Sequence, residues 1–88
     1  MMIMKVAAIY VLYHPEIDLL MRNIDSCLAQ VDNIYLIDNS DEEYDKGFLS
    51  NYGNSLTYID IGENKGIAYA LNLGCEKALS DGYLWCLT

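Results

Sequence analysis

Hydrophobic and polar residues follow two different periods along the chain, and these periods predict four strands and two long helices. Continuous apolar runs rich in Val, Ile and Tyr are typical of strands buried on both faces. Apolar residues repeated every three or four positions are typical of amphipathic helices. The predicted strands are residues 4–13, 33–37, 55–61 and 83–87, and the predicted helices are residues 16–31 and 67–79, with a weakly indicated short helix at 46–52.

Each long helix has one apolar face that we expect to be buried. Gly74 lies within the face of the second helix, where a glycine costs up to about 1 kcal/mol of helix propensity. We expect close packing of this helix against a sheet to compensate for that cost. The expected buried faces are Ile17, Leu20, Met21, Ile24, Leu28 and Val31 in the first helix, and Ile67, Ala70, Leu71, Gly74, Cys75 and Ala78 in the second.

The order of these elements predicts the fold class. Strands that alternate with helices favour an α/β fold, a parallel sheet with helices on both faces. We expect the strand order 3-2-1-4, because it places a switch point between strands 1 and 4, where ligands bind beyond the carboxyl ends of the strands. The chain stops at Thr88 within or just after an apolar strand. We therefore expect residues 1–88 to be an incomplete domain with exposed sheet edges that favour self-association.

Charge and composition exclude several classes of protein. Hydrophobic residues make up 53% of the 88 residues, which is too many for intrinsic disorder. Thirteen acidic residues against five basic ones give a net charge of −8, which argues against a partner nucleic acid or an anionic membrane surface. The apolar run at residues 6–13 is far shorter than a membrane-spanning helix, and no signal peptide is evident.

The cysteines indicate a reducing compartment. Cys27, Cys75 and Cys86 are odd in number, and they form no CxxC pair. Reduced thiols in a cytoplasmic protein are the favoured interpretation over a disulfide framework or a zinc site.

Three polar segments follow the ends of predicted strands, at residues 13–15, 38–40 and 63–66. Asp38 comes directly after a buried strand, where its carboxylate can accept the imide N–H of a uracil or thymine ring. The alternative is that Asp38 closes an Asx turn. Tyr13 either lies against a base or ribose or completes the core of the first strand.

The other candidate residues carry weaker signals. His14 precedes Pro15, so we expect extended backbone there, and without a partner acid at a recognisable spacing His14 is more typical of a loop than of a catalyst. The turn at Asn64 and Gly66 begins a helix whose amides favour an anion. Asn72 lies off the apolar face of that helix, either tolerated there or in contact with a ligand.

A nucleotide diphosphate bound to so acidic a chain needs a compensating charge. A divalent cation, Mg²⁺ or Mn²⁺, held by carboxylates is the usual solution. The acidic run at residues 41–45 is more typical of a solvated loop than of a metal site. We therefore expect no metal to be bound by residues 1–88 alone and place its ligands after Thr88.

Four stretches carry a family resemblance: VAAIYVLYHP, VDNIYLIDNS, ENKGIAYALNLGCEKAL and GYLWCLT. Together they resemble the Rossmann-like N-terminal half of family 2 glycosyltransferases of the GT-A fold, especially the bacterial rhamnosyltransferase-like branch. The third stretch is the most specific, because it is close to that family's Asn-x-Gly-x-x-x-Ala-x-Asn-x-Gly pattern. The resemblance implies that the chain is the nucleotide-sugar-binding part of such a domain, cut before the family's Asp-x-Asp metal motif.

The resemblance also implies roles for individual residues. Tyr13 and Asp38 become contacts to the nucleotide base, and His14 and Pro15 shape that loop. Asn39 and Ser40 resemble loop supports, and Lys65 falls at a variable position. The residues near the nucleotide sugar are Asn64, Gly66 and Asn72.

The implied reaction moves a sugar, with rhamnose as one candidate, from a UDP- or dTDP-sugar to a glycan or lipid-linked acceptor. Such an enzyme belongs to polysaccharide biosynthesis in the cytoplasm, at the inner face of the membrane, and this fragment alone should be inactive. A non-enzymatic flavodoxin- or receiver-like module is the alternative, but a receiver needs an acidic cluster where this chain has Tyr13, His14 and Pro15. A nucleotidyltransferase lacks support because no Gly-rich loop follows the first strand.

Overall fold

The computed structural model describes residues 5–83 and, for the backbone alone, residues 85–87. The elements follow in the order β1 (Val6–Leu12), α1 (Ile17–Leu28), β2 (Asn33–Asp38), the 3-10 helices η1 (Gly47–Asn51) and η2 (Gly53–Ser55), β3 (Leu56–Asp60), α2 (Ile67–Ser80) and β4 (Trp85–Leu87). Predictions for Met4, Leu84, Thr88 and the side chain of Cys86 lie outside the described residues. The strands, the two α-helices and η1 were predicted within a few residues, whereas η2 was not predicted.

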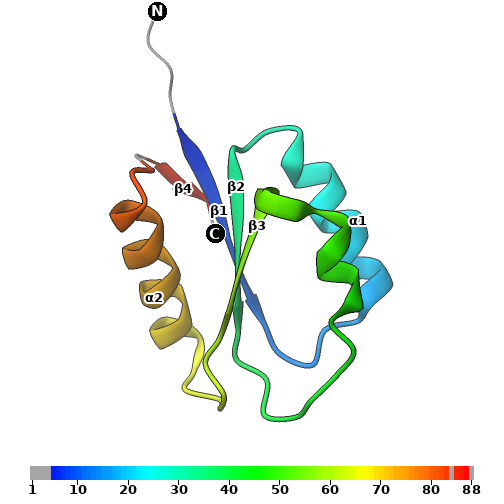
Figure 1. Cartoon of the computed structure of the whole chain (residues 1–88). Coiled ribbons are helices and arrows are strands. Elements are labelled where there is room, and N and C mark those ends of the chain that lie inside the picture. The colour runs from blue at the N-terminus through cyan, green and yellow to red at the C-terminus, as the bar shows by residue number, and fades with distance from the viewer. Residues whose placement is uncertain (1–4, 84, 88) are drawn as a thin grey trace, which may run out of the picture.

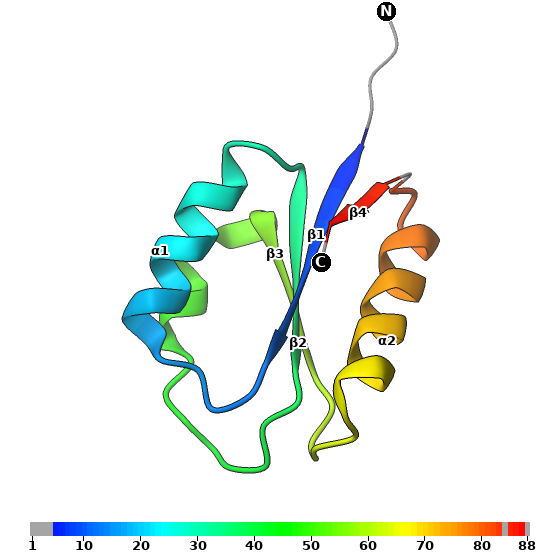
Figure 2. The same ribbon diagram turned by 180° about the vertical axis from the view of Figure 1, so that it is seen from behind.

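The four strands form one parallel sheet in the order β3-β2-β1-β4, as predicted. β1 pairs with β2 along six residues, whereas β4 pairs only with Val6, Ala7 and Ala8 of β1. All six residues of β2 are buried, because β2 is central and both of its faces are covered. Figure 1 shows α1 on one face of the sheet and α2 on the other, and Figure 2 shows the same arrangement from behind.

Two hydrophobic clusters, one on each face, hold the helices to the sheet. On the α1 face, Leu20 and Ile24 pack with apolar residues of β1 and β2 and with Phe48 of η1. On the α2 face, Ala70 and Ala78 pack against the alternate residues of the same strands. Burial of these apolar side chains is the main favourable contribution to folding.

The buried face of α2 differs from its prediction at its first turn. Ala70, Gly74 and Ala78 are buried as predicted, but Ile67 is 68% exposed. Ile67 is the first residue of α2, directly after the strand-end turn, so it lies beyond the part of the helix that covers the sheet. In α1 the prediction holds for Leu20 and Ile24, although the helix ends at Leu28.

The described residues contain no helix that is long and apolar enough to cross a membrane. Cys27 and Cys75 are free and half-buried, and the expected reduced state of the thiols stays a prediction.

Candidate functional site

The three predicted strand-end segments meet at one edge of the sheet, where the loops after β1, β2 and β3 lie side by side (Figure 1). The backbone N–H of His14 donates to Ser40 Oγ at 2.8 Å, which joins the first segment to the second. Asn39 joins the second segment to the third. The carboxyl ends of parallel strands lie at a common edge, and side-chain hydrogen bonds then hold the segments together.

Asn39 uses its whole side-chain amide to hold the turn that begins α2. Its Oδ1 accepts the N–H of Lys65 at 2.8 Å, and its Nδ2 donates to Asn64 Oδ1 at 2.9 Å. Asn64 Oδ1 also accepts the N–H of Gly66 at 3.0 Å. The expectation that Asn39 and Ser40 support loops is confirmed. However, the amides of Lys65 and Gly66 are occupied within the protein, so the donors available to an anion are those of the first turn of α2, which have no partner inside the helix.

Asp38 is almost completely buried, with 2% of its surface exposed. Its Oδ1 accepts the N–H of Ser40 at 3.0 Å, which is the Asx turn considered from the sequence. Its Oδ2 accepts the hydroxyl of Tyr44 at 2.6 Å and also the hydroxyl of Tyr58. Burial alone raises the pKa of Asp38, but the hydrogen bonds from the two tyrosines and Ser40 outweigh it and lower that pKa below its usual value. Asp38 is therefore an ionised hydrogen-bond acceptor at neutral pH.

The two tyrosines stay protonated beside this carboxylate. Burial and the hydrogen bond to Asp38 raise the pKa of both Tyr44 and Tyr58 well above the usual range. Sequence analysis did not identify either residue as part of the site. Tyr58 pairs in register with Leu36, which lies two residues before Asp38 on β2. Leu36 and Asp38 therefore share one face of the sheet, and this register is the signal that places Tyr58 near the carboxylate. The acidic loop around Tyr44 has no periodicity from which its contact could be found.

His14 has a partner that the sequence spacing did not reveal. Its Nε2 lies 2.6 Å from Asp41 Oδ1, and its ring packs edge-on against the ring of Tyr13. The prediction of extended backbone at His14 is wrong, because its φ is +47°, in the left-handed region. The hydrogen bonds to Ser40 and Asp41 hold the residue in this uncommon conformation.

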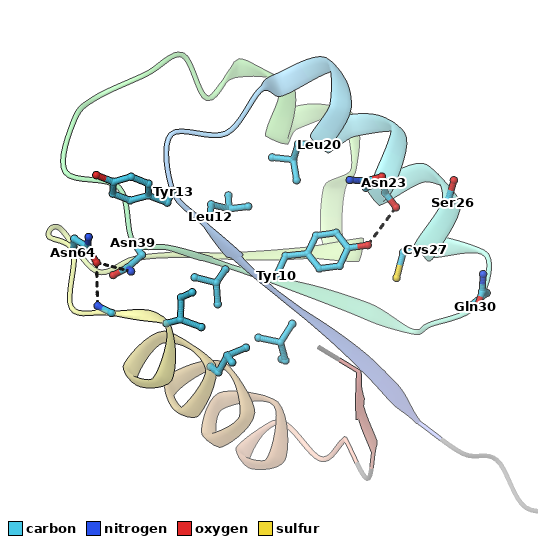
Figure 3. A pocket seen from close by; sticks show the side chains of 15 residues that line it. Tyr10, Leu12, Tyr13, Leu20, Asn23, Ser26, Cys27, Gln30, Asn39 and Asn64 are labelled. Atoms are coloured by element: carbon cyan, nitrogen blue, oxygen red, sulfur yellow. Dashed lines mark hydrogen bonds between the residues drawn. The ribbon is translucent and has the colours of Figure 1, made fainter.

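A large hollow of about 1060 Å³ runs along β1 between α1 and α2 (Figure 3). Tyr13, Asn39 and Asn64 lie together at one end of it. Cys27 of α1 and Gln30, in the turn after α1, lie at the other end. The middle of this hollow is lined by apolar residues of β1. Tyr13 at its end is 52% exposed and is therefore open to a ligand. A concave apolar surface with a few polar groups at one end is typical of a small-molecule site.

The edge of the sheet formed by residues 13–15, 38–40 and 63–66 is called the rim below. Asp38 faces a second, much smaller hollow of about 90 Å³ on this rim. The side chains around it are mainly acidic, with Lys46 as the cation. Of the six predicted site residues, Tyr13, Asn64 and Gly66 line the large hollow and Asp38 lines the small one. The acidic walls of the small hollow are Asp41, Glu42, Glu43 and Asp60.

The two remaining predicted site residues line neither hollow. His14 is bonded to the rim through Ser40 and Asp41, whereas Asn72 lies exposed on the second turn of α2. The structure therefore does not bring Asn72 to the junction of the three segments, and its predicted role stays a prediction.

Among residues 5–83, no three His, Cys, Asp or Glu side chains are grouped so that they could hold a metal ion. The expectation that the metal ligands follow Thr88 stays a prediction.

Gly66 begins α2 with a backbone conformation reserved for glycine, at φ +88° and ψ +159°. A Cβ at this position meets open space, so the requirement is conformational and not one of crowding. We expect Gly66→Ala to lower the free energy of unfolding by about 1–2 kcal/mol. Urea unfolding measures the change, and Glu63→Ala in the same exposed turn is the control, with an expected loss below about 1 kcal/mol. Equal losses in the two variants would contradict the argument.

The fold is a Rossmann-like α/β domain, a class in which ligands bind beyond the carboxyl ends of the strands. The family model described as glycosyl transferase family 2 matches residues 8–88. The chain therefore belongs to glycosyl transferase family 2, whose members transfer a sugar from a nucleotide-sugar donor to an acceptor, and its sheet is the Rossmann-like N-terminal part of a GT-A domain. No curated protein and no solved structure gives a significant match to the chain.

Proposed function

We propose that residues 1–88 form the nucleotide-sugar-binding part of a family 2 glycosyltransferase domain and that the donor is a UDP- or dTDP-sugar. The observation that carries this proposal is the hydrogen-bonded junction of the three strand-end segments through Asn39 and Ser40. It places an ionised carboxylate, an exposed aromatic ring and a helix start along one rim.

Each part of the rim suits one part of the donor. Asp38 accepts the imide N–H that uracil and thymine carry at N3 and cytosine lacks. Tyr13 lies against the base or ribose, and His14 holds its loop. The first turn of α2, after Asn64 and Gly66, supplies amide donors for the diphosphate. The acidic side chains of the small hollow repel the negatively charged diphosphate, whereas the base is neutral and is not repelled.

The remaining features of the proposal follow the family resemblance. Rhamnose is one candidate for the sugar, Asn72 contacts the donor sugar, and the acceptor is a glycan or lipid-linked hydroxyl at the inner face of the membrane. Mg²⁺ or Mn²⁺ stabilises the departing diphosphate, with ligands from residues after Thr88. In the described part of the chain, β3 is an outer strand of the sheet, and its free edge supplies a surface for homo-oligomers.

Titration of the isotope-labelled protein with UDP and dTDP in the presence of Mg²⁺ or Mn²⁺ tests the proposal. We expect amide chemical-shift changes to gather at Tyr13, Asp38, Asn64 and Gly66. We also expect both nucleotides to bind about tenfold more tightly than CDP, because cytosine has an acceptor at N3 where uracil and thymine have the N–H that faces the Asp38 carboxylate. Titration with dTDP-rhamnose and UDP-glucose then ranks the sugars.

Shifts confined to surfaces remote from the rim, or an equal affinity for CDP, would overturn the proposal. Asp38→Asn should weaken the binding of both nucleotides. Asp32→Asn serves as its matched control, because Asp32 is an exposed carboxylate before β2, at the opposite end of that strand. This substitution should leave the affinity unchanged. The family match does not favour the receiver-like alternative.

A further inference from the structure

Both oxygens of the carboxylate assigned to the donor base already accept hydrogen bonds from the protein's own groups, and Oδ2 has its full number. A carboxylate oxygen accepts about two hydrogen bonds. Oδ2 of Asp38 accepts two hydroxyls, from Tyr44 and Tyr58, and Oδ1 accepts the N–H of Ser40. With only 2% of Asp38 exposed, neither oxygen is open to an incoming ring.

The space beside Asp38 is also too small for a nucleoside. The small hollow measures about 90 Å³, whereas sites for small molecules generally measure at least about 300 Å³. A base can therefore reach Oδ2 only if one of the two tyrosines leaves and enlarges this hollow.

The two tyrosines differ in how firmly they are held. Tyr58 lies within β3, which pairs with β2 along its whole length. Tyr44 lies between β2 and η1, in a segment without helix or strand. Besides packing against the core, Tyr44 donates its hydrogen bond to Asp38 and lies beside the Tyr58 hydroxyl, and Lys46 Nζ lies 4.6 Å from its ring centroid. Lys46 itself pairs with Glu43 of the same segment at 3.1 Å.

We propose that Tyr44 is an internal competitor for the donor base: its hydroxyl occupies Asp38 Oδ2 in the free protein and is replaced by the imide N–H of uracil or thymine. The inference rests on the proposed function. Tyr58 and Ser40 keep their hydrogen bonds throughout and hold the carboxylate in place. A hydrogen bond to Asp38 is exchanged for another of the same kind, so the protein charge does not change.

This arrangement reduces the apparent affinity for the nucleotide, because only the fraction of molecules with Tyr44 displaced is competent to bind. Tyr44→Phe keeps the ring and removes the competing hydroxyl. We expect it to bind UDP and dTDP about three- to tenfold more tightly than the unaltered protein, as measured by titration calorimetry.

Tyr58→Phe is the matched control, because it removes the other hydroxyl from the same oxygen. It should not tighten binding, since Tyr58 stays on Asp38 in the bound state. Asp38→Asn should weaken binding. UDP methylated at N3 has no imide N–H, and Tyr44→Phe should give no gain with this ligand.

A direct measurement on the unaltered protein keeps the inference testable if a variant folds poorly. The ¹³Cζ resonance of Tyr44 should shift when UDP is added, and that of Tyr58 should shift much less. The inference is overturned if Asp38→Asn weakens binding, Tyr44→Phe does not tighten it, and the Tyr44 resonance does not shift. That result leaves the proposed function standing. Absence of UDP and dTDP binding, or insensitivity to Asp38→Asn, overturns the proposed function itself.

Discussion

Asp38→Ala is expected to lower the free energy of unfolding by about 3–5 kcal/mol at pH 7. The substitution leaves three donors without their acceptor at a buried position: the hydroxyls of Tyr44 and Tyr58 and the N–H of Ser40. Hydrogen bonds to a charged group contribute more than neutral ones, and a buried donor left unpaired carries the full cost of its desolvation.

The pH dependence gives this prediction a second, independent measurement. The pKa of Asp38 is lowered in the folded state, so its stabilising effect is complete above the unfolded value of about 4. It is lost as the pH falls through the folded-state pKa. Urea unfolding at pH 7 and at successive values below 4 should therefore show the difference between the unaltered protein and Asp38→Ala becoming smaller in acid.

Asp60→Ala is the matched control for Asp38→Ala. Asp60 pairs in register with Asp38 on the neighbouring strand, yet it is exposed and accepts a hydrogen bond only from the N–H of Gly62. Its replacement should cost less than about 1 kcal/mol. Similar losses in the two variants would show that the buried hydrogen bonds of Asp38 contribute little.

The layered fold and its rim could be predicted from the sequence because both depend on local patterns. The apolar run of β2 and the helical period of α2 are local, and parallel strands then place Tyr13, Asp38 and Asn64 at one edge without knowledge of any contact. The family match over residues 8–88 agrees with that arrangement. The Asx turn at Asp38 was also within reach, because it depends on two neighbouring residues.

The contacts that decide the chemistry of the rim could not be predicted in the same way. Tyr44 reaches Asp38 from a loop without periodicity, and His14 meets Asp41 across 27 positions of the chain. These contacts depend on where two loops settle after the sheet has formed. The exposure of Ile67 has a similar origin, since helical period alone cannot say how far a helix extends beyond its sheet.

Gly74 is the position where the packing of α2 on the sheet leaves no room for a side chain. A Cβ placed there lies 2.5 Å from Cγ2 of Ile9 and 3.1 Å from Cγ1 of Ile37, which are buried residues of β1 and β2. Close packing therefore compensates for the low helix propensity of this glycine, as the sequence predicted. In an exposed helix, replacing glycine with a better helix former stabilises by up to about 1 kcal/mol; here the sign should reverse.

Gly74→Leu is expected to lower the free energy of unfolding by about 3 kcal/mol, the upper end of the usual cost of overpacking a core. Glu76→Leu, on the exposed face of the same helix, should change stability by less than about 0.5 kcal/mol. Because Ile9 is the nearest obstacle, the double variant Gly74→Leu with Ile9→Ala should be more stable than the sum of the two single losses predicts. Urea unfolding of the two single variants and the double variant measures this. If the loss of stability in the double variant equals the sum of the two single losses, α2 moves away from the sheet instead of pressing on Ile9.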